Sequence, residues 1–140
     1  MKLFTINGDL IGEGESLRSI VEAHKSNLKG AKLRGADLRG INLRGINLRC
    51  ADLRCADLEG ADLEGADLRG ADLEDAYLVD ANLVGANLRD ANLRDADLED
   101  ANLESVDFRF ANLKDACLVG ANIEGAKLEG ANLEGTCLQG

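Results

Sequence analysis

Several residue types that mark particular classes of protein are scarce or missing from this sequence. The 140 residues include no proline, no tryptophan and one histidine, and aromatic residues make up only 3%. No apolar run approaches the length of a transmembrane helix, and the segment from Leu3 to Ile6 is too short for the core of a signal peptide. We therefore expect a cytoplasmic protein without a membrane-spanning segment.

Positive charge is also in deficit. Lysine and arginine number 16 against 26 aspartates and glutamates, which gives a net charge of -10. Such an excess of negative charge favours solubility and opposes nonspecific binding to nucleic acids and anionic membranes. We expect neither a nucleic acid nor a membrane as a direct partner.

Side-chain sets for catalysis or metal binding are missing as well. The single histidine, His24, falls on the apolar stripe of a short amphipathic segment, and no Ser-His-Asp or Cys-His arrangement can be built around it. The cysteines lie inside repeated phrases rather than in the disulfide framework of a small secreted fold, and without a nearby histidine they make a zinc site a weak hypothesis. These free thiols are Cys50, Cys55, Cys117 and Cys137. We expect no enzyme, no cofactor and no metal.

What the chain has instead is one five-residue phrase, Ala-Asp/Asn-Leu-X-Gly/Asp, repeated twenty-three times without a break from Ser26 to Gly140. Position three is Leu except at Phe108 and Ile123, and position one is Ala in most phrases. Position two is Asp or Asn in eighteen phrases, position four is mostly charged, and position five is Gly thirteen times and Asp six times. Positions one and three are therefore predicted to face inward and the others outward.

A period of five excludes both a continuous helix and a continuous strand. Successive residues on an α-helix turn by about 100°, so leucines five apart would spread round all sides, and each glycine would cost about 1 kcal/mol. On an extended strand side chains alternate, so an odd period would put successive leucines on opposite faces. A short extended segment followed by a turn at Gly or Asp satisfies the pattern. Bends in one sense wind the chain into coils that stack through backbone hydrogen bonds.

The phrases resemble those of the pentapeptide-repeat family, written A(D/N)LXX, as in Ala31-Lys32-Leu33-Arg34-Gly35 and Ala36-Asp37-Leu38-Arg39-Gly40. The resemblance covers 115 of the 140 residues. It implies an all-β fold, a right-handed quadrilateral parallel β-helix with four phrases in each coil and just under six coils. Its interior would be a ladder of leucines, with alanines in the smaller slots.

The residues before the repeat predict a cap. Lys2–Ile6 and Asp9–Gly12 flank Asn7-Gly8, a strong signal for a two-residue hairpin turn, and an amphipathic helix is expected from about Leu17 to Lys25. Stacked coils expose their first leucines and edge hydrogen-bonding groups, so an added element is needed to cover them. We predict two units, a cap at residues 1–25 and a solenoid at residues 26–140.

The composition of position five also predicts the corners. Glycine tolerates the positive φ of a type II turn, whereas aspartate and Phe110 would be strained there. We expect another turn type, most simply type I, wherever position five is not glycine.

If every twentieth residue stacks, one column of position four contains mostly arginine. Its members are Lys29, Arg49, Arg69, Arg89, Arg109 and Glu129. Stacked like charges are mildly destabilising, so the column needs an explanation. Asp67, Asp107 and the flanking carboxylates neutralise it in one interpretation; in the other, it is a groove for an anionic partner.

A second candidate surface is apolar. It consists of Tyr77, Val79, Val84 and Val119, with Cys117 nearby, on two neighbouring faces. Scattered exposed apolar residues are normal, and this is the simpler interpretation. The alternative is a binding strip, since these valines replace the charges found almost everywhere else at position four.

The last phrases lack any counterpart of the cap. They leave the end of the leucine ladder uncovered at Ile123, Leu128, Leu133 and Leu138. Because natural sheets rarely leave such an edge bare, we expect a two-fold homodimer through the terminal coil.

Two classes of function remain open from the sequence. The first is a non-catalytic structural or protein-interaction solenoid that presents a rigid charged surface to a protein partner. The second is implied by the family resemblance: a DNA mimic that modulates DNA gyrase or topoisomerase through an acidic rod. The unbroken run of phrases has no counterpart of the projecting loops of such relatives, and basic residues interrupt its acidic surface.

Overall fold

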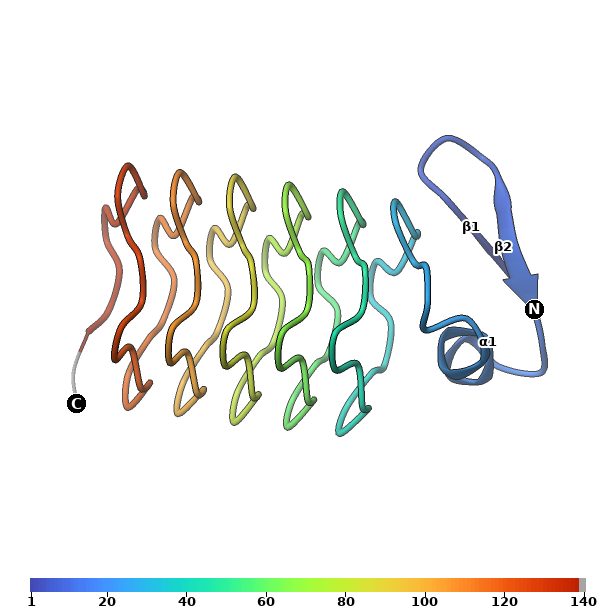
Figure 1. Cartoon of the computed structure of the whole chain (residues 1–140), viewed down its shortest axis with the longest axis horizontal. Helices are drawn as coiled ribbons and strands as arrows, with labels where there is room; N and C mark the ends of the chain where they lie inside the picture. The colour runs from blue at the N-terminus through green and yellow to red at the C-terminus, as the bar shows by residue number, and fades with distance from the viewer. Residues whose placement is uncertain (139–140) are drawn as a thin grey trace.

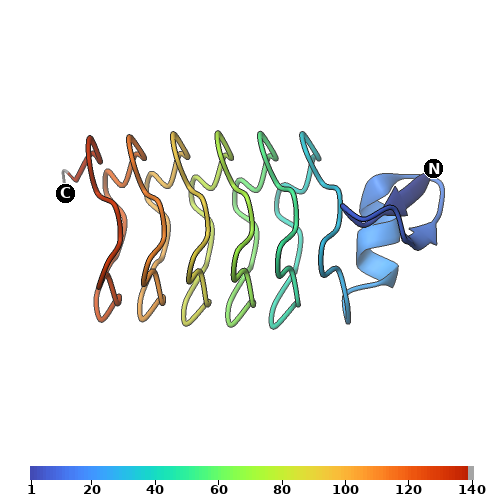
Figure 2. The ribbon, with the colours of Figure 1, turned by 90° about the horizontal axis from the view of Figure 1, so that it is seen from above.

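The chain forms a solenoid of stacked coils with a small cap at its N-terminal end. A computed structural model describes residues 1–138. Strands β1 (Lys2–Phe4) and β2 (Leu10–Glu13) and helix α1 (Leu17–Ala23) precede the coils. The coils follow one another along a single axis (Figure 1), and the hairpin and helix lie together at one end of the stack (Figure 2). In the described part of the chain, no helix is long and apolar enough to cross a membrane.

Each coil contains four phrases, as predicted. Parallel bridges join position-two residues twenty apart, for example Asp52 to Asp72 and Asp72 to Asn92. The Leu53 amide donates to the Asp72 carbonyl at 2.7 Å, and the Asp72 amide donates back to the Ala51 carbonyl at 2.9 Å. This exchange recurs on all four faces, so the backbone itself sets the twenty-residue register.

The interior is the predicted ladder of leucine and alanine. From Leu28 to Leu118, every residue at positions one and three is buried, with at most 5% of its surface exposed. Phe108 takes one leucine slot and is also buried. No residue among 1–138 whose side chain is polar or charged is buried. Apolar burial, worth roughly 1.5–3 kcal/mol for each large side chain, therefore dominates the stability of the stack.

The prediction of two turn types is wrong. Every position-five residue from Gly30 to Gly135 has a positive φ, including 58° at Asp75 and 62° at Phe110. The reason is that the corners must stack: the Asp75 amide donates to the Arg94 carbonyl of the next coil, and the Ala76 amide closes the turn on the Leu73 carbonyl, both at 3.0 Å. These bonds outweigh the left-handed strain, which costs about 1–2 kcal/mol and least for aspartate.

The hairpin forms, but without a two-residue turn. β1 and β2 pair antiparallel, with Lys2 opposite Glu13 and Leu3 opposite Gly12. The connection is longer than predicted because the chain after β1 pairs with the first coil. The Ile6 amide donates to the Gly30 carbonyl at 2.6 Å, and the carbonyl of Phe4, the last residue of β1, accepts from Lys32 at 2.8 Å. The cap thus covers part of the first coil's hydrogen-bonding edge.

Helix α1 ends at Ala23, two residues before the predicted end. Ser16 caps its first turn by accepting from the Ser19 amide, and Ile20 and Val21 are buried. His24 is the C-terminal cap, and its carbonyl accepts from the Asn27 amide at 3.1 Å as the chain enters the first coil. The helix therefore ends where the backbone begins to form the hydrogen bonds of the first coil.

Candidate functional site

Four arginines occupy equivalent positions in successive coils and form what we call the arginine face: Arg49, Arg69, Arg89 and Arg109. Bridges from Asn47 to Asp67, Asp67 to Asn87 and Asn87 to Asp107 place them in one column. They line an open pocket of about 410 Å³. The other lining residues are Cys50, Gly70, Asn87, Asp90 and Asp107. The structure thus brings all four arginines predicted for this column into one site.

Two of these arginines are neutralised within their own phrases. Arg69 donates from Nε to Asp67 Oδ1 at 2.8 Å and from Nη2 to Oδ2 at 2.6 Å. Arg109 makes the same two-pronged contact with Asp107. These hydrogen bonds lower the pKa of the Asp67 carboxyl below its usual value and that of Asp107 to about 2, against desolvation by partial burial, which raises both pKa values. Both carboxyls are ionised at neutral pH and mask their arginines.

The other two arginines have no such partner, because position two of their phrases is asparagine. Asn47 and Asn87 accept the backbone amides of Arg49 and Arg89, each at 3.2 Å. Within residues 1–138, neither guanidinium lies within 4.0 Å of a carboxylate. The Nε of Arg49 is moreover buried without any hydrogen-bond partner, which is rare for a buried donor. The charge of Arg49 still helps to lower the pKa of Asp67 in the next coil, but in the described part of the chain neither Arg49 nor Arg89 makes a direct ion pair, and we call these two the free arginines.

This freedom is unusual among the arginines of the chain. Arg44 pairs with Glu64 at 2.7 Å, and Arg94 pairs with Asp95 at 3.1 Å. Arg34 is the other arginine of the described residues without a carboxylate within 4.0 Å, and its phrase has Lys32 at position two. Arg49 and Arg89 are distinguished because both open onto the same pocket.

Sequence reasoning missed Phe110, which lies at the corner after Arg109. It is 57% exposed, and the Arg89 guanidinium carbon stands 5.6 Å from its ring centre. A cation over an aromatic face is attracted by the ring quadrupole. The signal was present in the sequence, since Phe110 is an aromatic residue in an outward slot that otherwise holds Gly, Asp, Cys or Ser.

The apolar candidates do not form a continuous strip. Tyr77 is 54% exposed, while Val79 and Val119 are half-buried. The bridges place Asp97 between Tyr77 and Cys117 in one column, so an acidic coil separates the two apolar ones. Val84, also half-buried, lies one phrase further along the coil, on the neighbouring face.

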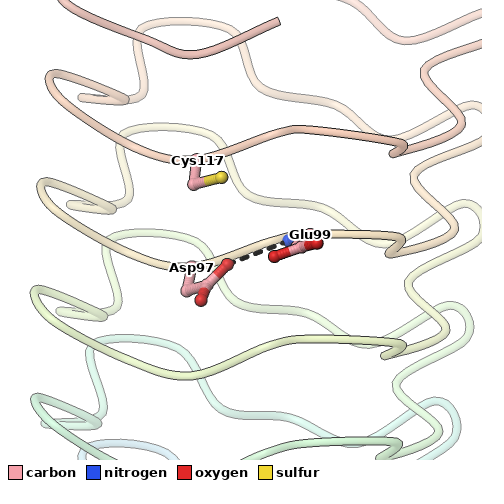
Figure 3. A group of neighbouring side chains, drawn as sticks. All are labelled: Asp97, Glu99 and Cys117. Atoms are coloured by element: carbon pink, nitrogen blue, oxygen red, sulfur yellow. Dashed lines mark hydrogen bonds between the residues drawn. The ribbon is translucent and has the colours of Figure 1, made fainter. Parts of the chain in front are cut away.

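Asp97 and Glu99 of the separating coil form a cluster of ligand-type side chains with Cys117 of the next coil (Figure 3). One potential ligand atom from each lies within 4.8 Å of the others. Asp97 Oδ1 accepts the Glu99 amide at 3.1 Å, the same local contact that aspartate and asparagine make at position two of other phrases, such as Asp57 with Glu59. Structural zinc sites use four ligands, mostly Cys and His, whereas this group offers two carboxylates and one thiol. We assign no metal to it.

The residues of the predicted dimer edge are uncovered. Ile123 and Leu133 are each 39% exposed and Leu138 is 56% exposed, whereas Leu128 is half-buried. These values contrast with the fully buried leucines of the preceding coils.

Comparison with known proteins identifies the repeat. The sequence profile of pentapeptide repeats matches in eight copies over residues 26–65, 56–95, 66–104 and 107–140. No curated protein shows significant similarity to this chain.

Solved structures show the same architecture. Rfr23, a pentapeptide repeat protein from the cyanobacterium Cyanothece 51142, is 36% identical with a TM-score of 0.65, and the match covers 66% of this chain and 64% of Rfr23. A pentapeptide repeat protein from the thylakoid lumen of Arabidopsis thaliana is 31% identical with a TM-score of 0.51, covering 86% and 72% of the two chains. QnrB1, a plasmid-mediated fluoroquinolone resistance protein, shares the fold at 23% identity and a TM-score of 0.52, covering 76% and 59%. This chain therefore belongs to the pentapeptide repeat family and folds as a right-handed quadrilateral β-helix.

Proposed function

We propose that this protein is a non-catalytic interaction solenoid that binds an acidic segment of a partner protein on its arginine face. The observation that carries the proposal is the open pocket onto which Arg49 and Arg89 both face, with no carboxylate of residues 1–138 within 4.0 Å of either guanidinium. In a chain with a net charge of -10, unneutralised positive charge gathered on one face favours an anionic partner there.

The composition of this face supports a protein partner. Arginine and aromatic residues are enriched among the side chains that dominate binding at protein interfaces, and Arg89 with Phe110 supplies both. The stacked coils below them hold the side chains on a buried, hydrogen-bonded scaffold, which lowers the entropy lost on binding. The aspartates of the solenoid recur at positions two and five with the period of the repeat, a spacing that serves the fold and singles out no acid–base pair.

The test is the binding of short peptides to the whole protein, followed by fluorescence anisotropy. A glutamate-rich peptide is expected to bind, and an uncharged peptide of the same length is not. The double variant Arg49→Glu and Arg89→Glu should weaken the binding at least about tenfold, because two attractive contacts become repulsive.

The matched control reverses two arginines on a neighbouring face, Arg34→Glu and Arg94→Glu. This change alters the net charge equally, so it separates a local site from the overall field. Equal losses in the two double variants would contradict a site on the arginine face.

The alternative function, a DNA mimic acting on gyrase, has less support. The similarity to QnrB1 is at the level of the fold alone, and the arginine face interrupts the acidic surface that a mimic needs. No feature of the described residues favours it over the interaction solenoid.

We also propose that a second copy of the chain covers the exposed leucines of the coil formed by residues 121–138. A two-fold contact would bury Ile123, Leu133 and Leu138 against their counterparts and would close on itself. Sedimentation at several concentrations should show a monomer–dimer equilibrium that the double variant Leu133→Arg and Leu138→Arg shifts to monomer. A monomer at every concentration, or a dimer that the variant leaves intact, would contradict the contact.

A further inference from the structure

The free and masked arginines of the arginine face alternate along the axis. Arg49 is free, Arg69 is held by Asp67, Arg89 is free and Arg109 is held by Asp107. The two kinds of arginine differ in the residue at position two of their phrase, which is aspartate for a masked arginine and asparagine for a free one. An aspartate there accepts the Nε and Nη2 donors of its arginine, whereas an asparagine accepts only the backbone amide. Arg44 and Arg94 also follow an asparagine at position two but pair with Glu64 and Asp95 instead. On the arginine face, where the described residues supply no such second partner, position two decides which charges a partner can reach.

The two free arginines stand two coils apart. The bridges from Asn47 to Asp67 and from Asp67 to Asn87 show that their phrases stack in register. At the usual strand spacing of about 4.8 Å, Arg49 and Arg89 leave the backbone about 10 Å apart. A partner that engages both must present two anionic groups at about that separation.

This separation discriminates between partner conformations. On an extended strand, side chains on one face recur every 6.8 Å or so, and neither one nor two such steps gives 10 Å. On an α-helix, residues i and i+7 rise about 10.5 Å and lie on nearly the same face. Two carboxylates seven residues apart on a helix therefore match the free arginines.

The charges between and beside the free arginines also restrict the charge pattern of a partner segment. Asp90 and Asp107 line the same pocket. Asp90 has no ion-pair partner within 4.0 Å among the described residues, so it would repel a carboxylate that came close to it. These carboxylates therefore make a helix with two well-separated acidic residues a better ligand than a uniformly acidic segment.

We propose that Arg49 and Arg89 form a two-point site for a partner helix that bears carboxylates at positions i and i+7, and that Asn47 and Asn87 determine this specificity by leaving both arginines unmasked. The inference rests on the proposed function and names the kind of acidic segment that the arginine face accepts. Phe110 borders the site beside Arg89, where it offers an apolar contact to the same helix.

The first test varies the spacing of charge in the ligand. Alanine-based helical peptides of identical composition, each with two glutamates, are titrated into the full chain and followed by fluorescence anisotropy. The i,i+7 peptide is expected to bind several-fold more tightly than the i,i+4 and i,i+10 peptides. Equal binding of all three peptides would overturn the two-point site. The proposed binding of an acidic partner would still stand in that case.

The second test masks the arginines without removing them. The double variant Asn47→Asp and Asn87→Asp gives Arg49 and Arg89 the neighbour that Arg69 already has. Masking both arginines weakens two exposed charge contacts at once, so binding of the i,i+7 peptide should fall about tenfold. The Nε–H resonances of Arg49 and Arg89 should also shift when the peptide is added to the natural sequence, but not in this variant.

The matched control makes the same change on another face. Asn42→Asp with Asn102→Asp adds the same two charges at position two, and the affinity for the i,i+7 peptide should stay within about twofold of the unmodified chain. An equal loss in both double variants would mean that net charge alone governs binding, which contradicts the masking role of Asn47 and Asn87. Failure of every acidic peptide to bind the unmodified chain would overturn the proposed function together with the site.

Discussion

Leu88→Ala is expected to lower the free energy of unfolding by about 2 to 5 kcal/mol. Leu88 has no exposed surface, and it lies in the middle of the leucine ladder, in the column of Leu68 and Phe108. The backbone on both sides is held by hydrogen bonds to neighbouring coils, such as that from the Leu88 amide to the Asp107 carbonyl at 2.8 Å. The surrounding coils therefore have little freedom to close the cavity, and the loss should fall toward the upper part of the range. Urea unfolding followed by far-UV circular dichroism measures it.

The chain supplies its own control for this change. Leu138 occupies the same slot of the repeat but is 56% exposed in the single chain, so Leu138→Ala should cost less than about 1 kcal/mol at concentrations where the chain is monomeric. If Leu88→Ala costs no more than Leu138→Ala, the leucine ladder is not what holds the coils together. A predominantly helical spectrum for the unmodified chain would refute the solenoid itself.

Gly65→Pro is expected to destabilise the fold by about 3 kcal/mol or more. Gly65 has a φ of 66°, whereas a proline ring holds φ near −65°. The substitution also removes the amide that donates to the Val84 carbonyl of the next coil at 2.9 Å. Apart from the chain neighbours, no atom lies within 4 Å of the position of a new Cβ, so a Cβ clash with another coil does not contribute to the effect.

Gly65→Asp tests the same corner with a residue that other corners contain. Asp75, Asp80 and Asp90 all adopt φ between 57° and 59°, so the aspartate variant should lose less than about 1 kcal/mol, measured in the same urea titration. A proline variant as stable as the aspartate variant would show that the corner amide and its left-handed φ are dispensable.

The architecture was readable from the sequence because a five-residue period is incompatible with any other regular structure. The inward leucines, the four-phrase coil and the column of Arg49, Arg69, Arg89 and Arg109 all follow from counting residues once the family resemblance gives the coil length. What counting did not provide was the state of each arginine. In one of the two interpretations Asp67 and Asp107 neutralise the column, but each makes a direct ion pair only with the arginine of its own phrase. The sequence shows whether position two of each phrase is Asp or Asn, but it does not show that this residue decides whether the arginine of the same phrase is masked by an ion pair.

The N-terminal cap shows that a local sequence signal can fail when a distant contact decides the structure. Asn7-Gly8 predicts a tight hairpin from local preference, but the Ile6 amide bonds to Gly30, twenty-four residues further along the chain, and the loop opens to make that contact. Local turn signals carry no information about such a distant partner. Phe110 was missed as a site residue for a related reason, since its contact with Arg89 arises only when successive coils stack.

By itself the sequence determined which side chains face the interior and how often the chain must bend, because apolar burial follows the period of the repeat. Only the tertiary structure decided the shape of the corners and the pairing of the charges. Corner residues as different as Asp75 and Phe110 share one left-handed conformation because hydrogen bonds between coils, each worth about 1 kcal/mol, act together against a local strain of similar size. The arginine face exists for the same reason: residues twenty apart in the chain become neighbours only when the backbone ladder aligns them.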